Sequence, residues 1–220
     1  MTLFLCSSGF TSAKLADRFV ELFSKPRQDI SFAVVPNAMN LQQGSKSWFI
    51  DEVNRIAEHF SDNIDFVDIE ALPQSIWLER LLAADVIYFI GGENEPLFNA
   101  MEVSGFQNHV LELLLTKVYV GTSAGAMVTG QRLGKEAFEF MYGPEGTLAN
   151  QGLTNYLNIF DGCFIPHLDA PDFPGRNKDL VDQVAKRTSQ KIYALDEYSA
   201  LVYSNGKLET LGEVYEPKSA

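Results

Sequence analysis

The chain has 220 residues, of which 46% are hydrophobic and 21% are charged, a composition typical of a globular protein with a large core. Its formal net charge of −12 argues against a broad basic surface for nucleic acid and against docking on an anionic membrane. No run of about 20 apolar residues occurs, so no membrane span is expected.

The first half of the chain alternates between short apolar runs, which predict strands, and segments with helical periodicity. The predicted strands cover residues 3–7, 31–36, 64–69, 85–90 and 117–120. The predicted helices cover residues 12–24, 47–60, 75–83 and, with an interruption near Gly105, 97–115. Ser12 is the candidate N-cap of the first helix. This alternation predicts a mostly parallel sheet with helices on both faces.

The second half of the chain has a more mixed pattern. Strands are predicted at residues 157–166, 192–195, 199–203 and 207–211, and a helix at 176–188. The last two strands flank Asn205-Gly206, a strong signal for a two-residue hairpin turn. We therefore expect antiparallel strands at the C-terminal side of the sheet, and a functional site beyond the carboxyl ends of the parallel strands.

The most informative motif is Gly121-Thr-Ser123-Ala-Gly125, which directly follows the fifth predicted strand. A Gly-x-Ser-x-Gly turn between a strand and a helix exposes the serine hydroxyl at the end of a sheet. The N–H of Ala124 would then lie at a helix start, where it faces a developing oxyanion. Gly91-Gly92, after the fourth predicted strand, offers a second N–H for the same purpose. The alternative is that both motifs are plain strand-end turns without chemistry.

A serine nucleophile needs a base that accepts its proton, and the base needs an acid that orients it. His167 is the best candidate base, because it lies at the end of an apolar, strand-like run. His59 lies near a helix end and His109 inside a helical pattern, where packing or exposed roles fit better. Without a serine turn upstream, a structural role would be the preferred interpretation of His167 as well.

Four acidic residues are candidates for the third member: Asp169, Asp172, Asp196 and Glu197. Asp169 and Asp172 lie in a proline-rich loop, where solvent would surround them. Asp196 and Glu197 directly follow a predicted strand, and the residues alone do not choose between these two. The order serine, histidine, acid differs from the serine, acid, histidine order of α/β-hydrolases and argues against that fold.

The two cysteines, Cys6 and Cys163, both lie in apolar runs. Two cysteines make no disulfide framework, and buried free thiols fit a reducing compartment, so a cytoplasmic location is expected. The cysteines and the three histidines lack metal-ligand spacing, so no metal site is expected.

Taken together, these motifs resemble the peptidase E family of serine peptidases, which includes aspartyl dipeptidase and cyanophycinase. The resemblance is carried by Gly91-Gly92-x-Asn94, Gly121-Thr-Ser123-Ala-Gly125-Ala, Pro166-His167 and Asp196-Glu197-x-Ser-Ala-Leu. It spans residues 86–202, more than half of the chain. It implies a flavodoxin-like three-layer α/β sandwich similar to that of class I glutamine amidotransferases, in which the nucleophile is a cysteine.

The resemblance also implies roles for individual residues. Ser123 would be the nucleophile, His167 the base, and Glu197 rather than Asp196 the third member. The N–H groups of Gly92 and Ala124 would form the oxyanion hole. Aspartyl dipeptidase cleaves dipeptides with an N-terminal aspartate, cyanophycinase cleaves β-aspartyl-arginine links, and neither uses a metal or organic cofactor.

We therefore expect a single domain over residues 1–220 that hydrolyses small peptides, including dipeptides with an N-terminal aspartate. No nucleic-acid or membrane partner is expected, and both a monomer and a homodimer remain open. Residues 138–155 are rich in loop signals and form either a cover over the site or a plain surface connection.

The chain departs from the family where Glu93 and Glu95 flank Asn94, a candidate substrate-binding residue, in place of the family's Gly-Gly-Gly-Asn-Thr. Two carboxylates at the mouth of a pocket disfavour an aspartyl substrate unless they point away. A site that reads aspartate needs a cation, because arginine grips a carboxylate through two parallel hydrogen bonds. Arg176 is the first candidate and Arg132 the second, and a solvated arginine is the alternative.

Two other functions remain open on the sequence alone. An esterase or another amidase would use the same residues, since Ser–His–acid machinery performs acyl transfer in general. A non-catalytic binding module would retain Ser123 as a relic, although the three-part constellation argues against this. A glutamine amidotransferase is disfavoured because no cysteine occupies the turn.

Overall fold

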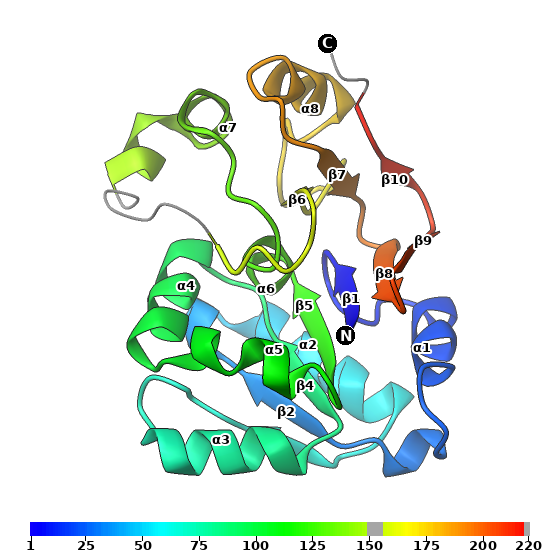
Figure 1. Cartoon of the computed structure of the whole chain (residues 1–220). Coiled ribbons are helices and arrows are strands. Elements are labelled where there is room, and N and C mark those ends of the chain that lie inside the picture. The colour runs from blue at the N-terminus through cyan, green and yellow to red at the C-terminus, as the bar shows by residue number, and fades with distance from the viewer. Residues whose placement is uncertain (149–155, 218–220) are drawn as a thin grey trace.

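The computed structural model describes residues 1–148 and 156–217, and within them the main sheet has seven strands in the order β3-β2-β4-β5-β1-β8-β9 (Figure 1). These strands are β1 (Thr2–Cys6), β2 (Phe32–Val35), β3 (Ile64–Phe66), β4 (Val86–Phe89), β5 (Val118–Thr122), β8 (Ala200–Ser204) and β9 (Lys207–Leu211). The first five run parallel, and β8 and β9 form an antiparallel hairpin beside β1. The predicted mostly parallel sheet with a C-terminal hairpin is confirmed.

Helices cover both faces of this sheet. They are α1 (Ala13–Val20), α2 (Ser47–His59), α3 (Gln74–Ala83), α4 (Asn94–Val103), α5 (Val110–Leu113), α6 (Ala124–Met127), α7 (Lys135–Leu148) and α8 (Lys178–Ala185), with 3₁₀ turns at Arg27–Asp29, Asn37–Met39 and Phe106–Asn108. Ser12 caps α1 as predicted, because its side chain accepts a hydrogen bond from the N–H of Leu15 at 3.4 Å. In the part of the chain that the structure describes, no helix combines the length and the apolar character that a membrane span requires.

Alternate residues of each strand face opposite layers. Leu3 belongs to the same buried core as Trp77 of α3, whereas Phe4 belongs to a second core and packs edge-to-face on Phe19 of α1. Because side chains alternate along a strand, the buried β1 contributes to both cores at once. The result is the three-layer α/β sandwich that the sequence predicts.

A second, smaller sheet has the strand order β10-β7-β6 and lies over the carboxyl ends of β1 and β5 (Figure 1). It consists of β6 (Cys163–Ile165), β7 (Ile192–Leu195) and β10 (Val214–Tyr215), where β6 and β7 are parallel and β10 is antiparallel to β7. Helices α7 and α8 pack against it through a third apolar cluster that includes Ala137, Ile165 and Val181. The segments that carry His167 and Glu197 therefore come from a separate sheet.

The strand predicted at residues 157–166 is wrong for its first six residues, because only Cys163–Ile165 is a strand. Asn158 and Gly162 have φ values of 51° and 143°, which interrupt an extended backbone. The N–H groups of Leu157 and Ile159 donate instead to the carbonyls of Val128 and Thr129, in the segment after α6. This stretch is a connection that packs on the main sheet's layer of helices.

The loop expected at residues 138–155 is also wrong where the structure describes it. Helix α7 occupies Lys135–Leu148 and is kinked at Gly143, which has φ 77° and ψ 170°. The helix is stabilised by burial of Phe138, whose ring lies 4.7 Å from that of Tyr142. The rest of the interval, residues 149–155, lies outside the described residues.

Candidate active site

Ser123 occupies a strained turn between β5 and α6. Its backbone angles, φ 48° and ψ −112°, are rare for a residue with a side chain and cost on the order of 1–3 kcal/mol. The turn is held by a hydrogen bond from the Ser123 N–H to the Cys6 carbonyl at 3.0 Å. A Cβ atom on Gly125 would lie 2.1 Å from the Phe89 carbonyl oxygen, so only glycine lets α6 approach β4 this closely.

A chain of hydrogen bonds joins three of the predicted site residues. The Oγ of Ser123 lies 2.9 Å from Nε2 of His167, and Nδ1 of His167 lies 2.7 Å from Oε1 of Glu197. With Nδ1–H donating to the carboxylate, Nε2 is free to accept the serine proton. His167 is 8% exposed, so water has little access to this chain. The hydroxyl proton of Ser123 can therefore pass directly to Nε2 of His167.

The Glu197 carboxyl is ionised more readily than usual. Burial on its own would raise its pKa, but hydrogen bonds from His167 and Ser8 outweigh burial and hold the pKa below its ordinary value. An ionised carboxylate is the state that orients a histidine and stabilises an imidazolium.

The other candidate acids form no hydrogen bond with His167 among the described residues. Oδ1 of Asp196 accepts a hydrogen bond from the N–H of Tyr198 at 2.9 Å and so closes a local turn. Asp169 and Asp172 are exposed, as expected for a proline-rich loop. The structure therefore brings Glu197, and not these three, into contact with His167.

The two predicted oxyanion donors both lie beside Ser123. An ideal Cβ on Gly91 would lie 3.1 Å from the Cβ of Ser123, which shows how closely the Gly91-Gly92 turn adjoins the serine. Gly92 has φ 138°, and a Cβ there would lie 2.3 Å from the Ala38 carbonyl oxygen, so glycine is required. Within residues 1–148 and 156–217, no hydrogen bond engages the N–H of Gly92 or of Ala124.

These groups open into a pocket of about 620 Å³ at the carboxyl ends of the parallel strands. Its lining includes the apolar side chains Trp48, Met127, Tyr142 and Phe173, the cations Arg55 and Arg176, and the acids Glu52, Glu93 and Asp172. Asn94 also lines it, and its side-chain N–H donates to the hydroxyl of Tyr156. The volume is in the range typical of small-molecule sites.

Arg176, the first candidate cation, lines this pocket next to the base. Its guanidinium carbon lies 4.5 Å from the centroid of Phe173, and the Phe173 ring stacks on His167 at 4.2 Å. Its Nη1 donates to the Pro166 carbonyl at 3.1 Å, which fixes the side chain against the loop that carries His167. Burial lowers the pKa of Arg176 from its usual value. This arrangement can present a partly desolvated cation to a substrate.

The two glutamates that depart from the family pattern have different surroundings. Glu95 is 7% exposed and points into a buried network, where it accepts hydrogen bonds from the Tyr156 hydroxyl at 2.8 Å and from Nε of Arg132 at 3.2 Å. Arg132, the second candidate cation, is absent from the lining of the pocket. Glu93 does line the pocket and accepts a hydrogen bond from Gln42 at 3.3 Å.

Sequence reasoning missed several pocket residues, notably Ser8, Glu52 and Arg55. Glu52 is 4% exposed and accepts a hydrogen bond from the Tyr88 hydroxyl at 2.8 Å, and burial raises the pKa of its carboxyl. Nη2 of Arg55 donates to the Ser8 carbonyl at 3.0 Å. One signal was available: Glu52 stands on the apolar stripe of α2, an unusual place for a charged residue.

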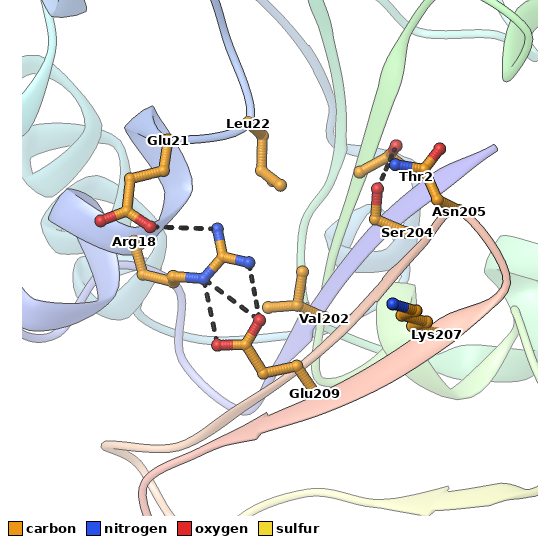
Figure 2. A pocket seen from close by; sticks show the side chains of 9 residues that line it. All are labelled: Thr2, Arg18, Glu21, Leu22, Val202, Ser204, Asn205, Lys207 and Glu209. Atoms are coloured by element: carbon orange, nitrogen blue, oxygen red, sulfur yellow. Dashed lines mark hydrogen bonds and ion pairs between the residues drawn. The ribbon is translucent and has the colours of Figure 1, made fainter.

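A second hollow, of about 430 Å³, lies at the opposite end of β1, where Thr2 and Ser204 meet (Figure 2). Two cations, Arg18 and Lys207, line this hollow, and Figure 2 shows Arg18 paired with Glu209 and Glu21, at 2.6 Å and 3.4 Å. None of the nine lining residues is a histidine or a cysteine. Ser123 and His167 line the larger pocket instead.

The thiols of both cysteines are buried and form no disulfide. Burial raises the pKa of Cys163 to about 12 and raises that of Cys6 as well. The reactive thiolate form is therefore suppressed at both positions.

A strained serine on a strand-to-helix turn, hydrogen-bonded to a histidine at the carboxyl ends of a parallel sheet, is an arrangement typical of serine hydrolases built on α/β folds, and the α/β-hydrolase fold itself is not the one seen here. The family model described as peptidase family S51 matches residues 3–211, so the chain belongs to peptidase family S51 and is a serine-type peptidase. The resemblance to the peptidase E family is thereby confirmed.

Related proteins agree with this assignment. An uncharacterized peptidase of Listeria monocytogenes is 23% identical over 84% of this chain and 87% of its own length. An uncharacterized peptidase of Pasteurella multocida is 22% identical over 92% and 93% of the two chains. The fold is similar to a crystal structure of a candidate peptidase E protein from Listeria monocytogenes, with a TM-score of 0.73, 22% identity and coverage of 96% and 97%. It is also similar to a peptidase from an acI-B1 Actinobacterium, with a TM-score of 0.68, 19% identity and coverage of 100% and 91%.

Proposed function

We propose that this serine peptidase hydrolyses small peptides through Ser123, His167 and Glu197 and an acyl-enzyme intermediate. The observation that carries the proposal is the unbroken hydrogen-bond chain from the Ser123 hydroxyl through His167 to Glu197, with distances of 2.9 and 2.7 Å. Two N–H groups without partners among the described residues, on Gly92 and Ala124, adjoin the same serine.

The proposed reaction follows the general course of acyl transfer by a serine. The Ser123 oxygen attacks the peptide carbonyl while its proton moves to Nε2 of His167, and Glu197 stabilises the imidazolium that forms. The N–H groups of Gly92 and Ala124 stabilise the oxyanion of the tetrahedral intermediate. His167 then gives its proton to the leaving amine, and water, activated by the same imidazole, releases the acyl group and restores the serine.

We propose dipeptides with an N-terminal aspartate as the preferred substrates. Arg176 supports this, because its guanidinium lines the pocket beside His167 and is partly desolvated, which strengthens its attraction for a carboxylate. The feature that argued against an aspartyl substrate is weakened, since Glu95 is directed into the network with Arg132 and only Glu93 lines the pocket.

The test is the hydrolysis of a panel of dipeptides with Asp, Glu, Ala, Leu or Arg at the N-terminal position. Wild-type protein and Ser123→Ala are compared, with thermal unfolding as the check on folding. We expect cleavage of Asp-X dipeptides by wild type, and its loss in a Ser123→Ala variant that unfolds at the wild-type temperature. Full activity of Ser123→Ala would overturn the mechanism.

The role of Arg176 is tested with the neutral variant Arg176→Met. We expect kcat/KM for Asp-X dipeptides to fall by about 100-fold, which corresponds to the loss of a charged hydrogen bond. Arg187→Met is the matched control, because Arg187 also stacks on an aromatic ring, that of Phe140, but is absent from the pocket lining. Serine-dependent cleavage of the other dipeptides with equal efficiency would retain the mechanism and reject the aspartyl preference.

A further inference from the structure

We propose that Ser7 and Ser8, at the carboxyl end of β1, are positioning residues for the catalytic groups. The Ser7 hydroxyl holds the backbone of His167 in place. The Ser8 hydroxyl holds the carboxylate of Glu197. This inference rests on the proposed function, because it takes these two groups as part of the machinery that activates Ser123.

Ser7 links the main sheet to the smaller sheet beside His167. It is 1% exposed, and its Oγ donates to the Leu195 carbonyl at 2.9 Å and accepts from the N–H of His167 at 3.0 Å. His167 has φ 64°, a left-handed conformation that residues with side chains keep only when their surroundings impose it. Without the Ser7 hydroxyl, this buried N–H would lack an acceptor, and the backbone would relax away from Ser123.

Ser8 acts on the third member of the triad. Its hydroxyl donates to Oε2 of Glu197, while Oε1 of the same carboxylate accepts from Nδ1 of His167 at 2.7 Å. Because each oxygen has its own donor, the carboxylate cannot rotate without breaking one of the two bonds. The Thr11 hydroxyl donates to the backbone carbonyl of Glu197, so both ends of this residue are tied to the segment after β1.

The segment itself is firmly held. β1 is paired on both sides, with β5 and with β8, and the Cys6 carbonyl at its end accepts the hydrogen bond from Ser123. Nη2 of Arg55 donates to the Ser8 carbonyl at 3.0 Å. Gly9, with φ 74°, then turns the chain so tightly that a Cβ would lie 2.5 Å from the Tyr88 hydroxyl. The consecutive residues Cys6, Ser7 and Ser8 are thus hydrogen-bonded to Ser123, His167 and Glu197, respectively.

A direct contact with substrate is the competing explanation, because both serines also line the pocket. The two roles differ in kinetics. Loss of a substrate contact raises KM or the inhibitor constant KI, whereas loss of a positioning bond lowers kcat or the inactivation rate constant kinact at unchanged binding.

The experiment measures covalent labelling of the full chain by an alkyl fluorophosphonate, which reacts with an activated serine, and resolves kinact and KI. The variants are Ser7→Ala, Ser8→Ala and Ser8→Thr, and the last retains a hydroxyl. Ser204→Ala is the matched control, because Ser204 is also a serine that lies beside β1. It lies at the opposite end of β1, where its hydroxyl is hydrogen-bonded to that of Thr2 (Figure 2).

We expect Ser7→Ala and Ser8→Ala to lower kinact about tenfold or more, the usual consequence of losing a hydrogen bond to a charged or strained group. KI should stay within about twofold of wild type, Ser8→Thr should recover most of the rate, and Ser204→Ala should match wild type. Ser8 is only partly buried, so its pair of variants decides the proposal even if Ser7→Ala fails to fold.

Two results would overturn the inference while leaving the proposed function intact. One is labelling of Ser8→Ala at the wild-type rate, and the other is a change confined to KI. Absence of labelling at Ser123 in wild-type protein would instead refute the proposed function, and the inference with it.

Discussion

The substitution Gly125→Ala tests how closely α6 packs on the sheet. The added Cβ would lie 2.1 Å from the Phe89 carbonyl oxygen, 2.7 Å from its carbonyl carbon and 2.9 Å from its Cβ. Since carbon atoms in contact are separated by about 3.5 Å or more, the new Cβ overlaps the carbonyl carbon by about 0.8 Å and the Phe89 Cβ by about 0.6 Å. The obstacle is the backbone of the central strand β4, which cannot move aside. We therefore expect Gly125→Ala to lower the free energy of unfolding by about 3 kcal/mol, the upper end of the range for overpacked cores.

For a chain of this size, that loss corresponds to a decrease in melting temperature of about 6–12 °C. Ser123 precedes α6 directly, so a displaced helix also moves Ser123 away from His167, and on the proposed mechanism fluorophosphonate labelling should become slower. The assays are thermal unfolding followed by circular dichroism, and the rate of labelling.

Gly134→Ala is the matched control, because the nearest atom to its new Cβ is the Gln190 Oε1 at 3.9 Å. The free energy of unfolding should change by less than about 1 kcal/mol, and toward greater stability, since alanine restricts the unfolded chain. Equal melting temperatures for Gly125→Ala and Gly134→Ala, together with equal labelling rates, would refute the reasoning.

Three further predictions concern charged groups. Glu197→Gln should lower kcat by about 10³-fold or more on any dipeptide that wild type cleaves, whereas Asp196→Asn should stay near wild type, and the reverse result would assign the role to Asp196. Arg132→Met removes the ion partner of the buried Glu95 and should cost about 3 kcal/mol in urea unfolding; an unchanged midpoint would contradict this. Burial raises the pKa of Glu52, so stability that is fully present below its unfolded pKa of about 4.5 is lost as pH rises through the folded pKa. Glu52→Gln has no such proton to lose, so its stability relative to wild type should increase as the pH rises above about 4.5, and parallel curves of stability against pH would refute the linkage.

Local patterns were enough to predict the main sheet. The apolar run at β4 indicates a buried strand, and the apolar stripe on α2 indicates a helix with one buried face. Both patterns can be recognised within a short stretch of sequence. The hairpin of β8 and β9 was equally accessible, because Asn205-Gly206 supplies the positive φ values, 53° and 76°, that its turn requires.

The two wrong elements had local patterns that tertiary contacts overrode. The run before β6 is apolar enough for a strand, but its N–H groups bond to the segment after α6, so it cannot also join a sheet. In α7, Gly143-Pro suggests a loop, yet burial of Phe138 in the third apolar cluster sustains a helix that bends at this glycine. Neither competing contact is visible from the sequence around it.

In the candidate site, too, local sequence patterns identify some residues, whereas others are identified only by their tertiary contacts. Ser123 and His167 stand next to recognisable strand ends, which allowed them to be singled out from the residues alone. Glu197 also follows a predicted strand, but so does Asp196, and the choice between these two rested on the family resemblance. Ser8 also follows a predicted strand, but nothing near it in the sequence identifies its partner Glu197, which lies 189 residues away. Only the order of the strands explains the contact.

β1 lies between β5, which leads into Ser123, and β8, which follows the loop of Glu197. The residues at the end of β1 therefore lie close to the segments that carry Ser123 and Glu197. An apolar side chain in place of Ser7 and Ser8 would leave the His167 N–H without its acceptor and Oε2 of Glu197 without its donor. Two consecutive serines at the end of the first strand, together with a distant Gly-x-Ser-x-Gly, form a pattern that a sequence search for this site can use.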